Sequence, residues 1–306
     1  MRLIAGFIFI SILITKISSD KDSVNFTDCR QNQKPTFSFG IIADVQYADK
    51  EPAGTRYYKS SVAKLREAIS AFKQDSVDFV ITLGDLIDQD INSYDPLLNI
   101  MDSSGLKFYH VSGNHDYSVD PSLKEKLPEV YFREPGFFAI THKNFRFVFI
   151  NGNEISTYST KDTTIIKEAE TLIDSIKKRG GQNAVEWNGA VSKKQLTWLD
   201  EQINKASREN SKVFLICHFP VFPDNIHNLL NYNDVLSVIR KYDNCIAWFN
   251  GHNHEGNYGK LNKTHFVTFK GMVETENQNS FARVEVYSNK VIITGSGREK
   301  SRILTE

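Results

Sequence analysis

The chain has 306 residues, 40% of them hydrophobic and 12% aromatic, with 37 basic and 37 acidic side chains. This length and apolar content are sufficient for one large domain with a sizeable core. The balanced charge argues against a general nucleic-acid-binding protein, which would carry a basic excess, although a local basic patch is not excluded. No nucleic-acid partner is therefore expected, and a monomer is favoured.

The N-terminus carries an apolar run from Leu3 to Ile14 behind a single arginine. This run of about 12 residues is shorter than the roughly 20 that span a bilayer, and it is typical of a secretory signal peptide. Residues 1–19 are therefore predicted to be a signal peptide cleaved near Asp20; the alternatives are an uncleaved anchor or a buried strand. The protein is expected to be secreted or luminal, without stable membrane insertion.

Two sequons, at Asn25 and Asn262, agree with a secretory route and are candidate glycosylation sites. The three cysteines form no disulfide framework. Cys217 and Cys245 lie in apolar runs and are expected to be small buried residues. Cys29 lies in a polar stretch, where it can be free or paired.

After a polar tail at residues 20–36, strands alternate with helices in one predicted domain at 37–306. Apolar runs predict buried strands at 37–44, 77–85 and 106–114. Helices are predicted at 57–74, where four apolar side chains recur at steps of three and four residues, and at 95–105, with Gly105 as a stop. This alternation predicts parallel strands.

The remainder of the chain adds antiparallel strands. Two aromatic-rich runs within 137–152 predict a hairpin around the turn "HKN". Helices are predicted at 161–179, at 192–206 with Ser192 as the N-cap, and at 233–242. Further strands are predicted at 212–220, at 245–252, and in the closing runs "THFVTFKGM", "FARVEVYS" and "KVIITG". The predicted fold class is a mixed α/β sandwich in one domain.

Five predicted strands end in side chains of one chemical kind. These side chains are Asp44, Asp85, Asp88, Asn114, His115, Asp116, His218, His252 and His254. Ligands of open α/β sheets bind beyond the carboxyl ends of the strands, so these segments would bring their polar groups to one rim. Each feature alone is ordinary, because Asp and Asn are common in turns and a lone histidine is usually a core residue. Together they favour a metal site.

The donor set also suggests which metals would bind. Carboxylate, amide and imidazole ligands suit Mn, Fe or Zn. Two ions about 3.5–4 Å apart, sharing a carboxylate, can activate water and neutralise a phosphate. The donor set therefore suits one divalent ion or a pair of ions that share a carboxylate.

At these residues the chain resembles the calcineurin-like metallophosphoesterases. The motifs are "DVQ" (44–46), "GDLID" (84–88), "GNHD" (113–116), "CHFP" (217–220) and "GHNH" (251–254). Their order and spacing agree with the family pattern from about residue 37 to the end. The resemblance implies two sheets with helices outside them, an αββα sandwich. Purple acid phosphatases would have Tyr at the position of Asp88.

One departure is informative: Gln46 replaces the usual His of the first motif. Glutamine can bind a metal only through its carbonyl oxygen. The opening "ADVQYAD" and the runs "GTRYYKSSVAKLREAI", "WNGAVSKKQLTWLDE", "CHFPVFPD" and "FKGMVETENQNSFARVEVY" are similar to the manganese-dependent ADP-ribose/CDP-alcohol diphosphatase branch. The glutamine is therefore interpreted as a feature of that branch.

The resemblance implies two divalent ions, Mn with Fe or Zn as alternatives. One ion would be held by Asp44, Gln46, Asp85 and His254. The other would be held by Asp85, Asn114, His218 and His252. His115 would face the phosphate as a catalytic residue, and Asp116 would orient His115.

The function implied is hydrolysis of the diphosphate linkage of ADP-ribose, CDP-choline or related nucleotides, which yields a nucleoside monophosphate. The alternatives are a broader phosphomonoesterase or phosphodiesterase and a nucleotide-binding protein without turnover. Tyr47, Tyr58 and Phe222 are candidate stacking residues for a base, with core packing as the alternative. The branch would be cytosolic, but localisation is determined by the N-terminal signal.

Overall fold

The computed structural model describes residues 34–124, 127 and 136–305. The chain divides into two compact units, residues 1–34 and 35–306. The predicted signal peptide, the sequon at Asn25 and Cys29 lie outside the described residues, so these expectations stay predictions. The second unit contains both sheets and every helix described below.

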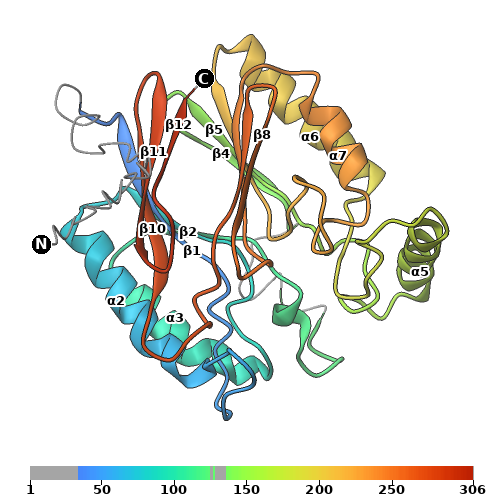
Figure 1. Ribbon diagram of the computed structural model, residues 1–306, viewed down its shortest axis with the longest axis horizontal. Coiled ribbons are helices and arrows are strands. Elements are labelled where there is room, and N and C mark those ends of the chain that lie inside the picture. Colours follow the sequence, from blue (N-terminus) through green and yellow to red (C-terminus); the bar gives the residue numbers. More distant parts are fainter. Residues whose placement is uncertain (1–33, 125–126, 128–135, 306) are drawn as a thin grey trace, which may run out of the picture. The chain divides into compact units, whose positions relative to one another are not determined.

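The first sheet has six strands in the order β12-β11-β10-β1-β2-β3 (Figure 1). The strands are β1 (Phe37–Ile42), β2 (Phe79–Thr82), β3 (Phe108–His110), β10 (Ser280–Val286), β11 (Lys290–Gly297) and β12 (Arg302–Thr305). Strands β1, β2 and β3 run parallel to one another. Strand β10 pairs antiparallel with β1 and β11, and β11 pairs antiparallel with β12. Helices α2 (Ser61–Gln74) and α3 (Tyr94–Ser103) pack on the outer face, where Leu65 and Phe72 share a buried cluster with Val80.

The second sheet has the order β4-β5-β6-β7-β9-β8. Its strands are β4 (Phe138–His142), β5 (Phe145–Phe149), β6 (Lys212–Ile216), β7 (Cys245–Asn250), β8 (Asn257–Leu261) and β9 (Thr264–Thr268). Helices α6 (Lys193–Arg208) and α7 (Tyr232–Ile239) cover its outer face. Helix α5 (Thr163–Lys178) lies apart from them (Figure 1), and its buried side chains belong to a separate small hydrophobic cluster. Short 3-10 turns occur at η1 (Tyr58–Ser60), η2 (Ile91–Ser93) and η3 (His115–Tyr117).

The predicted αββα sandwich is confirmed, and each predicted helix and strand is present with shifted ends. Ser192 caps α6 by accepting a hydrogen bond from the Gln195 amide at 3.1 Å. Gly105, at φ +72°, follows the end of α3 as expected. Most strands are shorter than predicted because their polar ends turn into loops.

The sequence prediction was wrong about the late strands in two respects. It missed β8 and β12, which are short and lie at the edges of the sheets. The expected antiparallel additions are present in the β4–β5 hairpin and in β10 and β11, but β9 runs parallel to β7. The reason is β8, which reverses the chain direction before β9 and pairs antiparallel with it.

Two further expectations concern cysteines and membranes. Cys217 and Cys245 are free and buried, as predicted. In the part of the chain that the structure describes, no helix has the length and hydrophobicity needed to cross a membrane.

Phenylalanine rings fill the space between the two sheets. Phe39 of β1 is fully buried and stacks on Phe79 of β2, with ring centroids 5.2 Å apart. Its ring also meets Phe147 of β5 edge-on at 5.4 Å. Offset and edge-to-face ring contacts contribute free energy beyond the buried area. These rings fix the spacing of the sheets and therefore the positions of the strand ends.

Replacing Phe39 with alanine tests this core. We expect Phe39→Ala to lower the free energy of unfolding by about 3–5 kcal/mol, because it removes a buried ring and leaves a cavity. The loss is measured by urea denaturation, with Phe39→Leu as the matched control and a smaller expected loss. A loss below about 1 kcal/mol for Phe39→Ala would contradict this account of the core.

Candidate metal centre

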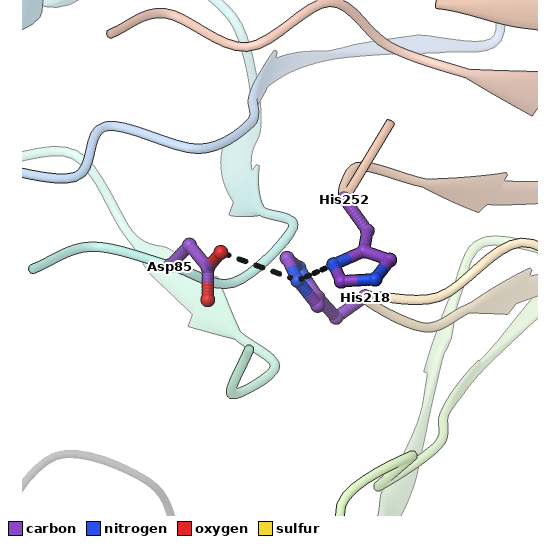
Figure 2. A group of neighbouring side chains, drawn as sticks. All are labelled: Asp85, His218 and His252. Carbon is purple, nitrogen blue, oxygen red and sulfur yellow. Dashed lines mark hydrogen bonds and ion pairs between the residues drawn. The ribbon is translucent and has the colours of Figure 1, made fainter. Parts of the chain in front are cut away.

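The loops that follow β1, β2, β3, β6 and β7 meet at one edge of the sandwich, as the sequence predicted. Figure 2 shows Asp85, His218 and His252 pointing toward one another, each with one ligand atom within 4.8 Å of the others. His218 Nε2 lies 3.1 Å from His252 Nδ1 and 3.4 Å from Asp85 Oδ2. All three side chains are buried. Two imidazole nitrogens and a carboxylate in contact form a donor set suited to a borderline divalent cation.

Asn114 extends this group. Its Oδ1 lies 3.2 Å from His218 Nε2. The structure thus brings together Asp85, Asn114, His218 and His252, the four residues that the resemblance assigned to one ion.

The second predicted ligand group adjoins the first through Asp85. His254 Nε2 lies 3.5 Å from Asp44 Oδ1 and 3.2 Å from Gln46 Nε2. Gln46 Nε2 donates to Asp85 Oδ2 at 3.0 Å. The two groups therefore share Asp85, as a bridging carboxylate requires.

Gln46 provides a specific test of whether a metal fits. Its Oε1 is buried without a hydrogen-bond partner, which is costly for a carbonyl oxygen. The oxygen and nitrogen of a side-chain amide exchange places by a half turn about the last bond. That turn would direct the oxygen toward His254 and Asp85, where it would be a metal ligand. The residues present therefore fit a divalent cation.

Each predicted histidine ligand is held by its other ring nitrogen. The donor and acceptor pairs are His218 Nδ1 to the Leu83 carbonyl at 2.7 Å, His252 Nε2 to Asn188 Oδ1 at 3.0 Å, and His254 Nδ1 to Glu274 Oε1 at 2.7 Å. Such partners fix the tautomer and ring orientation of metal-binding histidines. In all three rings the nitrogen that faces the cluster is left to accept a metal.

The carboxylates make this site strongly attractive to positive charge. Burial disfavours the charged form of His218, but the charge of Asp85, its hydrogen bond and the charge of Asp44 together outweigh burial and raise the pKa of His218 to about 9. Burial also lowers the pKa of His254, but the charge of Asp44 and hydrogen bonds to Asp44 and Glu274 raise that pKa to about 9. Burial, together with the charge of His218, holds the pKa of His252 well below its ordinary value. Metal binding would displace the protons held by the first two histidines.

The backbone at the ligands is strained. Asp44, Gln46, Asp85 and His252 all have positive φ, at 50°, 42°, 52° and 65°. Non-glycine residues seldom adopt this region, and such strain concentrates at functional sites. The surrounding core compensates for it.

Two glycines are required by close approach. A Cβ on Gly113 would overlap Asp85 Oδ1, and one on Gly251 would overlap Asp44 Oδ2. This contact explains the first residue of both "GNHD" and "GHNH" in physical terms. The glycines leave room for the carboxylates that the ligand loops enclose.

The prediction that Asp116 orients His115 was wrong. His115 Nδ1 donates instead to Asp88 Oδ1 at 2.6 Å, and Lys50 also pairs with Asp88. Burial raises the pKa of Asp88, but hydrogen bonds from His115 and Lys50 outweigh it and lower that pKa. Asp88, the last residue of "GDLID", therefore holds the catalytic candidate.

Asp116 is fully buried, and most of its hydrogen bonds are to backbone amides. Its oxygens accept from the amides of Gly113 at 2.8 Å, Asp85 at 2.9 Å and Leu86 at 2.9 Å, and from the Tyr94 hydroxyl at 2.8 Å. With these bonds made, the carboxylate ties together the two loops that carry Asp85 and Asn114. None of these bonds involves the His115 imidazole.

Sequence reasoning also missed Arg56. Its Nη1 lies 3.5 Å from His115 Nε2, and its Nε lies 4.0 Å from Glu274 Oε1. The side chain is 36% exposed. A guanidinium that reaches solvent beside the catalytic candidate His115 suits a phosphate oxygen. Its only sequence signal is an arginine in a loop before a helix, which is common.

The three candidate stacking residues differ in how deeply they are buried. Tyr58 is 4% exposed and packs with Ala48 and Val273, while the Lys50 ammonium lies 4.0 Å from its ring centroid. The prediction for Tyr58 was therefore wrong, because its ring offers no open face. Tyr47 and Phe222 are half-buried against hydrophobic clusters, so their contact with substrate stays a prediction.

Asn262 lies exposed in the turn between β8 and β9. This position leaves its side chain accessible. A glycan on Asn262 stays a prediction.

Comparisons with known proteins agree with this site. The model of the family described as calcineurin-like phosphoesterase matches residues 37–256. A manganese-dependent ADP-ribose/CDP-alcohol diphosphatase of Xenopus laevis is 30% identical, covering 90% of this chain and 92% of the relative. The protein of that name from Arabidopsis thaliana is 29% identical, covering 88% and 97%.

A solved structure is also similar. The crystal structure of a dimetal phosphatase from Danio rerio superposes with a TM-score of 0.81 at 25% identity, covering 89% of this chain and 99% of that one. The family match includes every predicted metal ligand and His115. The chain therefore belongs to the calcineurin-like phosphoesterase family and is a metal-dependent hydrolase.

Proposed function

We propose that the protein hydrolyses the diphosphate linkage of nucleoside diphosphate compounds such as ADP-ribose and CDP-alcohols, with Mn²⁺ as its metal. The names of relatives at 30% and 29% identity over most of the chain support this substrate class. The observation that carries the proposal is the arrangement of His115 and Arg56. Their nitrogen atoms lie 3.5 Å apart, and the two residues adjoin Asp85 and Glu274, so both could meet oxygens of one diphosphate beside the metal ions.

Two divalent ions, when bound, supply neutralisation of phosphate charge and activation of water. Their protein ligands would be Asp44, Gln46, Asp85 and His254 for one, and Asp85, Asn114, His218 and His252 for the other. Asn188 and Glu274 would keep His252 and His254 in the required orientation.

The protein's own groups would act on the substrate as follows. Asp88 accepts a hydrogen bond from Nδ1–H of His115, and Nε2 faces Arg56. With His115 as the imidazolium, protonated at both nitrogens, Nε2–H would give its proton to the oxygen of the departing phosphate, and the ring would become neutral with Nδ1–H still bonded to Asp88. Arg56 would pair with a non-bridging oxygen of the same diphosphate and so neutralise charge that develops as the linkage breaks.

Incubation with Mn²⁺ and separate substrates tests the function. We expect release of AMP from ADP-ribose and CMP from CDP-choline, loss of both after chelation, and recovery when Mn²⁺ is restored. p-Nitrophenyl phosphate is the comparison substrate. Hydrolysis of that ester alone would replace the proposal with a broader phosphatase, and nucleotide binding without product would replace it with a binding protein.

Replacing His115 or Asp88 tests the proton donor. We expect His115→Ala to lower kcat by about 10²–10⁴-fold, the usual effect of losing a general acid. Asp88→Asn should lower kcat by a smaller factor, because the imidazole remains but loses its charged partner. Metal content, measured by mass spectrometry, should be unchanged in both. An Asp116→Asn variant with normal folding and normal metal content but a larger kcat loss than Asp88→Asn would reverse the assignment.

Replacing Glu274 tests the orientation of His254. We expect Glu274→Ala to weaken Mn²⁺ binding by about 10–100-fold, because His254 loses the acceptor that fixes its ring. Calorimetric titration with Mn²⁺ measures the effect. The matched control is Glu255→Ala, which removes an exposed carboxylate next to His254 in the chain. Equal affinities in the two variants would show that Glu274 has no such role.

A further inference from the structure

Two of the exposed large hydrophobic residues directly precede, in the chain, residues that contact the predicted metal ligand His252. Among the described residues, Trp187 is 45% exposed and Ile226 is 41% exposed. Trp187 immediately precedes Asn188, which accepts the hydrogen bond from His252. Ile226 immediately precedes His227, whose ring centroid lies 5.3 Å from that of His252. Single exposed apolar residues are ordinary, but two on loops that both contact His252 suggest a ligand.

Hydrogen bonds join the two loops that carry these side chains. Asn188 Nδ2 donates to the Ile226 carbonyl at 2.8 Å and to the Asn183 carbonyl at 3.0 Å. Asn183 Nδ2 in turn donates to the Leu229 carbonyl at 2.8 Å. Side-chain to backbone hydrogen bonds therefore hold the loop of Trp187 and the loop of Ile226 together.

The loop of Ile226 is also held from within. Asn225 Nδ2 donates to the Pro223 carbonyl at 2.7 Å, and Asn225 Oδ1 accepts from the His227 amide at 2.8 Å. Asn228 Nδ2 donates to the same Pro223 carbonyl at 3.2 Å. A loop fixed in this way presents its exposed side chains at little entropic cost, as a preformed binding site does.

His227 carries an unsatisfied polar atom at the same place. Its Nδ1 is buried and has no hydrogen-bond partner, while the ring stands edge-on to His252 at 86°. A buried ring nitrogen without a partner is uncommon and requires an explanation. A ligand or a water that it brings would supply the missing partner.

We propose that Trp187, Ile226 and His227 form the subsite for the nucleobase of the substrate, an inference that rests on the proposed function. The indole would stack on the base, since every base offers a flat π face and aromatic stacking tolerates different bases. Ile226 would cover an apolar edge, and His227 would meet a polar group of the nucleoside. This surface adjoins the His252 side of the metal centre.

Steady-state kinetics of Trp187→Ala with ADP-ribose and CDP-choline test the subsite. Both KM values should rise about tenfold, from lost stacking, with kcat within about twofold of wild type. Metal content should not change, because Asn188 is retained. The matched control is Tyr258→Ala, since Tyr258 is 43% exposed but bonds to His265 through its hydroxyl. This control should keep the wild-type KM for both substrates.

Other outcomes would overturn the subsite. Unchanged KM values for Trp187→Ala, or an equal rise in Tyr258→Ala, would show that the indole does not meet the base. A rise for CDP-choline alone would assign Trp187 to the choline cation instead.

A binding measurement separates failure of the subsite from failure of the proposed function. If wild-type protein hydrolyses neither nucleotide, the proposed function fails, and equilibrium dialysis with AMP in the presence of Mn²⁺ decides the subsite. AMP binding that weakens about tenfold in Trp187→Ala supports it. Equal binding in both proteins, or none in either, overturns it.

Discussion

The buried carboxylate of Asp85 is the constraint on which the rest of the site depends. The residue is 1% exposed, yet burial fails to raise its pKa, because His218, His115 and His252 hold the pKa well below its ordinary value. A buried anion is costly unless it is paired and hydrogen-bonded. Asp85 meets this condition with the His115 amide at 2.8 Å and with Gln46 at 3.0 Å. Its hydrogen-bond partners are donors and it pairs with His218, and a metal pair satisfies the same requirement.

The aromatic core holds these charged side chains close together by fixing the positions of the strands that carry them. β1, β2, β6 and β7 end at the same edge because rings such as Phe39, Phe147 and Phe214 hold the sheets in fixed register. Ligand loops can then adopt positive φ, since the strain is supported by strands that cannot move. Loss of core rigidity would displace several ligands together, because they come from both sheets.

Much of the site follows from sequence because its ligands lie directly after apolar strands. Asp85, His218 and His252 each occupy such a position, and parallel strand ends converge at one edge. The same reasoning predicted most of the elements, but it missed β8 and β12. These short edge strands bury few side chains, so their apolar pattern is weak.

The remaining site residues could not be read from local patterns. Glu274 and Asn188 lie 20 and 64 residues from the histidines that they hold, in loops without a periodic signal. The choice between Asp88 and Asp116 as the partner of His115 also depends on tertiary structure. Both residues follow strands, and Asp116 was predicted because it is next to His115 in the sequence. In the structure the Asp116 carboxylate accepts hydrogen bonds from amides about 30 residues away, and the imidazole pairs with Asp88 instead.

Asn188 connects metal binding with the proposed base subsite. Its Oδ1 accepts from His252, and its Nδ2 holds the carbonyl of Ile226, so one buried amide orients a metal ligand and positions an exposed apolar side chain. Because the side chain is fully buried and its amide is fixed at both ends, movement at either end would disturb the other. Nucleotide and metal would then bind with coupled free energies, each favouring the arrangement that the other requires. This coupling would act through one side chain, without any larger change in the fold.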